Sequence, residues 1–115
     1  MELEFNDKTY KFVFGLGFLK AVNRANKINA NGLQLNAGLE AIAANLMNGD
    51  IETLISVLRT ANETETPRMN EKAIAGYIEE NGADELFDTV FDELKKSEFT
   101  KKKVEKIMEE TEKAK

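Results

Sequence analysis

Cysteine and histidine are both absent from the 115 residues. Without them the chain can form no disulfide, no zinc–thiolate site and no redox motif. The Ser-His-Asp and Cys-His catalytic triads are excluded for the same reason, as is a histidine base near neutral pH. An enzyme of this sequence would have to use carboxylates, lysine or tyrosine, so we expect no catalytic residues, no metal ligands and no cofactor.

Long apolar runs are absent too, since none approaches the roughly 18 residues that a membrane span needs. The segment Met1 to Glu4 is acidic and lacks the basic leader and apolar stretch of a signal peptide. We therefore expect an intracellular protein without membrane association. The net charge of −5 also argues against a default nucleic-acid binder.

The composition that remains is globular, with 42% hydrophobic and 32% charged residues in a length that suits one domain. Short apolar–polar alternation near the N-terminus predicts a β-hairpin. Its apolar positions are Leu3 and Phe5, then Tyr10, Phe12 and Phe14. Asn6, Asp7 and Lys8 lie between the two strands and tolerate a left-handed turn. Because a lone hairpin is marginal in water, we expect its aromatic face to pack on helices.

About five helices are expected after the hairpin, so the fold class is α+β and mostly α. The first follows a corner at Gly15–Gly17 and runs to about Lys27. Predicted caps are Asn36, Asp50 and Asn70, while Asp84 opens the fifth helix. The stripes expected to face inward are Phe18, Leu19, Ala21, Val22, Ala25 and Ile28; Leu39, Ile42, Ala43, Leu46 and Met47; Ile51, Leu54, Ile55 and Leu58; Ile74, Tyr77 and Ile78; and Leu86, Phe87, Val90, Phe91 and Leu94.

Loops are predicted at residues 29–32 and 62–67, and a single globular domain at residues 1–96. Residues 97–115 are expected to form a charged tail that is mobile or partly helical. Apart from Ala114, only Val104, Ile107 and Met108 are apolar after Thr100, a stripe too narrow to hold a helix firmly against a core.

Three patterns were tested for chemistry. Asn29, Asn31 and Gly32 match part of a calcium-binding loop, but Lys27 and Gly38 stand where the first and last ligands belong, so a turn-rich loop is favoured.

The carboxylates of Glu85, Asp88 and Asp92 share one helical face. A solvated acidic face is favoured there over an acidic docking surface, and both over a metal or catalytic site. The run Lys101–Lys103 is read as part of a solvated tail rather than as a phosphate contact.

The hairpin and the segment after it carry a family resemblance. The pattern Leu3-x-Phe5-Asn6-Asp7-Lys8-x-Tyr10-x-Phe12-x-Phe14 runs into Gly15-Leu16-x-Phe18-Leu19. Later come Asn48-Gly49-Asp50, a helix from Leu54 to Leu58, Ile74-x-x-Tyr77-Ile78 and Leu86-Phe87-x-x-Val90. Over residues 2–96 the chain resembles the tail assembly chaperones of long-tailed phages and prophages of Gram-positive bacteria.

The resemblance implies a cytoplasmic assembly factor that is absent from the mature virion. Such proteins bind the tape measure protein, keep it soluble and pass it to tail-tube proteins, and self-association is expected with them. We expect partner contacts on the fifth helix. The residues concerned are Phe87, Phe91, Leu94, Asp88 and Asp92. The alternative function is a small DNA-binding regulator of a phage or bacterium, for which only Lys20, Arg24 and Lys27 approach a basic recognition helix.

Overall fold

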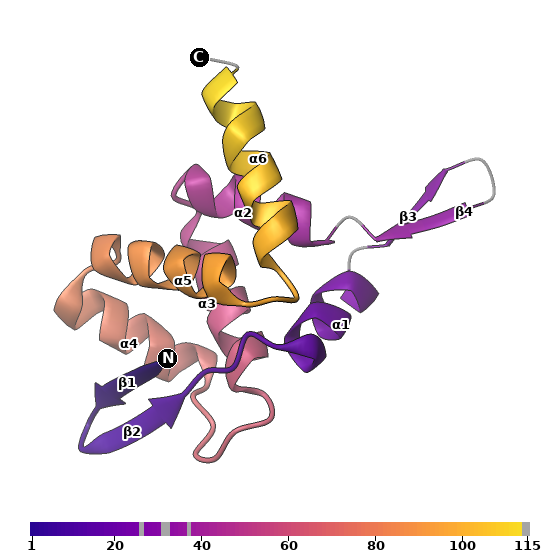
Figure 1. Ribbon diagram of the computed structural model, residues 1–115. Coiled ribbons are helices and arrows are strands. Elements are labelled where there is room, and N and C mark those ends of the chain that lie inside the picture. Colours follow the sequence, from indigo (N-terminus) through magenta and orange to yellow (C-terminus); the bar gives the residue numbers. More distant parts are fainter. Residues whose placement is uncertain (26, 31–32, 37, 114–115) are drawn as a thin grey trace.

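The computed structural model describes residues 1–25, 27–30, 33–36 and 38–113, and Figure 1 shows their arrangement. The elements in chain order are β1 (Glu2–Phe5), β2 (Lys8–Lys11), α1 (Leu16–Ala25), β3 (Lys27–Ala30), β4 (Leu33–Asn36), α2 (Gly38–Met47), α3 (Ile51–Asn62), α4 (Glu71–Asn81), α5 (Asp84–Lys96) and α6 (Lys101–Lys113). The predicted fold class, α+β and mostly α with an N-terminal hairpin, is confirmed.

The N-terminal hairpin closes through a two-residue turn. Strands β1 and β2 are antiparallel, with Leu3 opposite Tyr10 and Phe5 opposite Lys8. Asn6 and Asp7 between them have φ angles of 51° and 64°. Positive φ at both central residues matches the right-handed twist of the flanking strands, and Asn and Asp adopt it at low cost.

Aromatic side chains hold this hairpin on the helices, as the alternation predicts. Tyr10 and Phe12 are 7% and 2% exposed. The ring of Phe5 meets the ring of Tyr77 on α4 edge to face, with centroids 6.2 Å apart. Gly76 makes room for it, because a Cβ at this position would lie 3.1 Å from Phe5 Cζ. The hairpin is therefore part of the core and not a free arm.

Helix α2 lies centrally, in contact with α1, α3, α5 and α6, while α4 packs on α3. Each helix contributes one side to a single core. The fully or nearly fully buried apolar residues of that core are Phe14, Phe18, Val22, Leu39, Ala43, Leu46, Leu54, Val57, Leu58, Ala61, Met69, Ile74, Leu86, Val90, Leu94 and Val104, together with Tyr10 and Phe12.

Two predicted N-caps are confirmed. Asp50 accepts a hydrogen bond from the backbone N–H of Thr53 at the start of α3. Asn70 accepts one from Ala73 N–H, at 2.8 Å, at the start of α4. Gly82 ends α4 with a φ of 80°, as expected for a glycine in the left-handed region.

The region between α1 and α2 differs from the prediction. Helix α1 ends at Ala25, and Lys27 begins strand β3, which pairs antiparallel with β4 (Figure 1). Asn36 is the last residue of β4, and the residue just before α2 lies outside the described residues. Within the predicted loop at residues 29–32, Asn29 and Ala30 belong to strand β3, and residues 31 and 32 lie outside the described residues.

The sequence signal for this second hairpin lies in residues 27–30 and 33–36. Each segment alternates polar and apolar residues over four positions, and Asn-Gly separates the two in the sequence. That dipeptide between alternating segments is a strong hairpin signal. The sequence prediction missed this hairpin because it placed Ile28 at the end of the apolar stripe of a helix.

Ile51 was expected to face inward but is 40% exposed. It directly follows the exposed turn at Asn48–Asp50, where the chain is at the surface. The buried stripe of α3 begins one turn later and is Leu54, Val57, Leu58 and Ala61. Val57 and Ala61 were not in the predicted stripe.

The C-terminal segment packs more tightly than predicted. Residues 101–113 form α6, and Val104 is 0% exposed, while Ile107 and Met108 pack partly against the core. The expectation that this stripe is too narrow to pack is therefore wrong at Val104. Helices α2 and α5 both contact α6, so α6 packs on two helices of the core. The division of the chain at residue 96 stays a prediction.

Candidate functional site

The five residues predicted on α5 separate into buried and accessible groups. Leu94 is 0% exposed and belongs to the core, so its side chain presents no surface to a partner. Phe87 and Phe91 pack against that core and remain partly exposed. Asp88 and Asp92 are exposed beside them. The accessible part of the predicted site is therefore a narrow aromatic edge next to carboxylates.

The acidic side chains of this region are mostly solvated. Asp92 forms an ion pair with Lys95 at 3.4 Å, with both side chains well exposed. Such a surface pair contributes little to stability. Among residues 1–25 and 38–110, no group of three or more Asp or Glu side chains is arranged to hold a metal ion.

Three apolar side chains outside α5, which the sequence reading missed, are more exposed than Phe87 and Phe91. We name this set of residues the apolar corner: Val13, Leu16 and Phe99, which are 48%, 46% and 50% exposed. Val13 and Leu16 flank Phe14 at the junction between β2 and α1, and Phe99 lies in the turn between α5 and α6. Large apolar side chains that stay exposed are candidates for contact with a partner.

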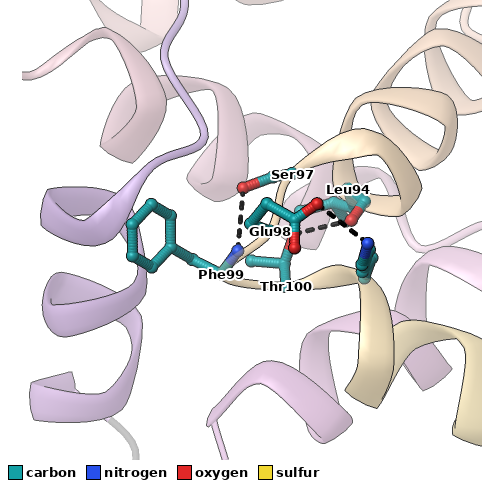
Figure 2. Close-up of polar contacts among 6 residues, drawn as sticks. Leu94, Ser97, Glu98, Phe99 and Thr100 are labelled. Atoms are coloured by element: carbon teal, nitrogen blue, oxygen red, sulfur yellow. Dashed lines mark hydrogen bonds and ion pairs between the residues drawn. The ribbon is translucent and has the colours of Figure 1, made fainter.

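Ser97 joins the two segments of the apolar corner. Its hydroxyl donates a hydrogen bond to the carbonyl oxygen of Phe14 at 2.6 Å. In Figure 2 the ring of Phe99 lies beside the ribbon of α1, away from the polar groups of its own turn. Phe14 and Ser97 are 83 residues apart in the chain, so no sequence window could have predicted this contact.

The turn that carries Phe99 is firmly held, as Figure 2 shows. The hydroxyl of Thr100 donates to the carbonyl oxygen of Leu94 at 2.6 Å, and Thr100 is only 1% exposed. The N–H of Phe99 donates to the Ser97 hydroxyl oxygen at 3.4 Å. These hydrogen bonds fix the backbone of the turn from which the Phe99 ring projects, and an already ordered backbone loses less entropy on binding.

The lysine run beside this turn is largely used within the chain. Lys101 pairs with Glu98 at 2.8 Å, and this hydrogen bond and charge raise the pKa of Lys101. Lys103 pairs with Glu40 on α2 at 3.3 Å. Lys102 is exposed. The run therefore forms the first turn of α6, where Lys101 and Lys103 are in ion pairs.

The three cations considered for a DNA-recognition helix do not share a helix. Lys20 and Arg24 lie on α1, whereas Lys27 begins strand β3. The alternative function, a DNA-binding regulator, therefore loses its main supporting feature in the sequence.

Comparison with known protein families shows which family the chain belongs to. The family model described as phage tail assembly chaperone protein, TAC, matches residues 2–109. The chain belongs to this family. The match extends through Val104 to the middle of α6, so the helix that the sequence reading treated as a tail is part of the family's pattern.

The resemblance inferred from the sequence is therefore confirmed, and the general role is that of a chaperone for phage tail assembly, which supports a non-enzymatic function. No curated protein and no solved structure matches the chain. In this chaperone, no helix among the described residues has the length and apolar character to cross a membrane.

Proposed function

We propose that this tail assembly chaperone binds the tape measure protein of its phage, keeps it soluble, and releases it to tail-tube proteins. It would act in the cytoplasm of the bacterial host, associate with further copies of itself, and be absent from the mature virion. The observation that carries the proposal is the family match over residues 2–109, in a chain that exposes the apolar corner and carries its Phe99 on a turn held by hydrogen bonds.

The physical argument starts from the client. A long amphipathic helical rod exposes apolar stripes until the tail tube surrounds it, so it aggregates when alone. A chaperone must cover those stripes reversibly with apolar surface of its own. It must also stay soluble with that surface exposed, and the net charge of −5 helps it do so.

Two surfaces of the chaperone fit this task. The apolar corner offers three side chains that are about half exposed, so each can lose further surface on binding. The edge of α5 offers Phe87 and Phe91, which are already partly covered. We propose that the apolar corner contributes more of the binding free energy, and that Phe87, Phe91, Asp88 and Asp92 form a secondary contact above the buried Leu94.

Co-expression tests the function directly. The tape measure protein of the same phage is expressed with the chaperone or with an empty vector, and its soluble fraction and any co-purified complex are measured. We expect a large rise in solubility and a complex that survives purification. Equal insolubility in both cases, with no complex, would refute the proposal, and a salt-sensitive shift of DNA would favour the regulator instead.

Single substitutions then locate the surface. Phe99→Ser removes the half-exposed ring and should weaken the complex strongly while leaving the melting temperature close to that of the parent, because the ring is not in the core. Ile51→Ser is a matched control, since Ile51 is a similarly exposed apolar residue outside the apolar corner. Equal losses from both variants would show that the apolar corner has no special part.

A further inference from the structure

A polar cleft of about 350 Å³ lies where α3 ends and α4 begins. Its charged lining residues are Arg59, Glu63 and Arg68. The cleft lies beside the loop that leads into α4 (Figure 1). None of its lining residues belongs to the apolar corner or to the edge of α5, so it is a separate feature of the surface.

An apolar groove adjoins this cleft. It has a volume of about 350 Å³ and is lined by residues of the β1–β2 hairpin, of α4 and of the segment just before α4. Its lining includes four apolar and two polar residues: Phe5, Tyr10, Ala73 and Gly76, with Asn70 and Lys72. Asn70 lines the cleft as well as the groove, so the two hollows adjoin, and we name the pair the α4 track.

Asn62 fixes the frame of the α4 track. Its side chain is buried, with 1% exposure, although the sequence placed it at the start of an exposed loop. The Asn62 Nδ2 group donates to the carbonyl oxygens of Lys11 and Pro67, at 2.9 and 3.2 Å, and its Oδ1 accepts the N–H of Met69 at 2.6 Å. These bonds tie strand β2, on the groove side, to the loop that carries Arg68. A frame that is ordered before binding loses less entropy when a partner docks.

The α4 track is positively charged on an acidic protein. Its lining contains three cations, Arg59, Arg68 and Lys72, and one carboxylate, Glu63. The whole chain, by contrast, has a net charge of −5. Arg59 reaches Glu71 only at 4.0 Å, and both side chains are more than half exposed, so this pair is weak. Among the residues that the structure describes, neither Arg68 nor Lys72 is in an ion pair. The local charge therefore favours an acidic partner.

The two halves of the track together define the chemistry of that partner. Guanidinium groups bind carboxylates through paired N–H donors. The groove beside them offers apolar surface to apolar side chains, as grooves that take amphipathic helices do. From Asn70 to Gly76 the groove follows α4 for about 9 Å, which about two turns of a partner helix would cover.

We propose that the α4 track is a docking site for an acidic amphipathic segment of another protein. The carboxylates of that segment pair with Arg59, Arg68 and Lys72, and its apolar side chains occupy the groove beside Phe5 and Tyr10. This interaction goes beyond the proposed function, which places client contacts on the apolar corner and on the edge of α5.

NMR titration of the full chain with a synthetic peptide tests the site. The probe is an amphipathic peptide of about 12 residues, roughly three helical turns, with leucines on one face and glutamates beside them. We expect backbone amide shifts along the α4 track, at Arg59, Arg68, Lys72, Ala73 and Gly76. Raising the salt from about 50 mM to about 0.5 M should weaken binding about tenfold, because salt screens exposed charges.

Two control peptides separate the contributions of charge and apolar surface. Replacing the glutamates by glutamines should weaken binding about tenfold, because the cations of the track lose their partners. Replacing the leucines by serines should also weaken it, while the remaining binding keeps its salt dependence.

Substitutions in the chain locate the contact. Arg59→Glu with Arg68→Glu should weaken binding of the glutamate peptide about tenfold or more, and a lysine version of the peptide should bind this double variant better than it binds the parent. Arg24→Glu is the matched control, since Arg24 is an exposed arginine on α1 outside the track. Ala73→Leu adds side-chain volume in the groove and should weaken binding without removing its salt dependence. Circular dichroism verifies that each variant is folded.

Three outcomes would overturn the proposal: no shifts along the track at about 2 mM peptide, equal binding of the glutamine peptide, or normal binding by the folded double variant. Equal shifts of the same amides when the chain alone is concentrated would show that a second copy occupies the track, and would overturn it too. The result is independent of client binding, because the co-expression assay and Phe99→Ser test the proposed function on different residues.

Discussion

Helices α5 and α6 have the same length, 13 residues, but are held to the core in different ways. Helix α5 buries Leu86, Val90 and Leu94, which are spaced by four and lie on one side. Helix α6 has one fully buried apolar residue, Val104. The difference teaches that a helix with few apolar residues can still dock when hydrogen bonds fix the turn before it and two other helices pack against it.

The largest effect is expected on α5. Leu94→Ala removes a side chain with no exposed surface, and it should lower the free energy of unfolding by about 3 kcal/mol through lost burial and a residual cavity. Chemical denaturation monitored by circular dichroism measures it. Lys96→Ala, at an exposed position of the same helix, is the control and should cost little.

Val104→Ala should have the second largest effect. It should lower the free energy of unfolding by about 2 kcal/mol, because it removes two methyl groups from a fully buried position. The same denaturation experiment applies, with exposed Lys106→Ala as the control. A loss as small as that of the control would mean that α6 is not docked in solution, and the contrast drawn between the two helices would fail.

Thr100→Val tests the turn itself. The change keeps the shape of a buried side chain but removes the hydroxyl that donates to the Leu94 carbonyl oxygen. We expect the free energy of unfolding, measured by the same denaturation experiment, to fall by about 1 kcal/mol, the usual net contribution of one hydrogen bond. A stabilised variant would show that burial of Thr100, and not its hydrogen bond, holds the turn.

Truncation should have the smallest effect. Removing residues 109–115 leaves Val104, Ile107 and Met108 in place and should change the melting temperature by less than about 2 °C, because no buried residue is described there. Removing residues 100–115 deletes the buried Thr100 and Val104 and should lower the melting temperature much more. If both truncations are harmless, the mobile tail predicted from the sequence is correct after all.

Local features were well predicted. The turn residues Asn6 and Asp7, the caps Asp50 and Asn70, and the stop at Gly82 were all read correctly. Each depends on a few neighbouring residues whose backbone preferences and hydrogen bonds act over one turn of chain. The second hairpin was missed for a local reason too, because a helical reading of Ile28 competed with a strand reading.

The candidate sites were predicted less well. On α5 the sequence could place Phe87, Phe91 and Leu94 on one stripe, yet it could not tell which of them would be covered. Whether an apolar side chain is exposed depends on what packs over it, and that partner is usually distant in the chain. Ile51 and Phe99 show the same limit, since both are apolar and both remain accessible.

The sequence by itself determined the chemistry that is impossible here, since a chain without cysteine and histidine excludes disulfides and histidine catalysis. It also determined most helices and the first hairpin, because periodicity and capping act locally. Only the tertiary structure decided that Ser97 meets Phe14, that Asn62 joins Lys11 to Met69, and that Val104 is enclosed. These contacts join residues that are distant in the chain, and their formation depends on how all the helices pack at once.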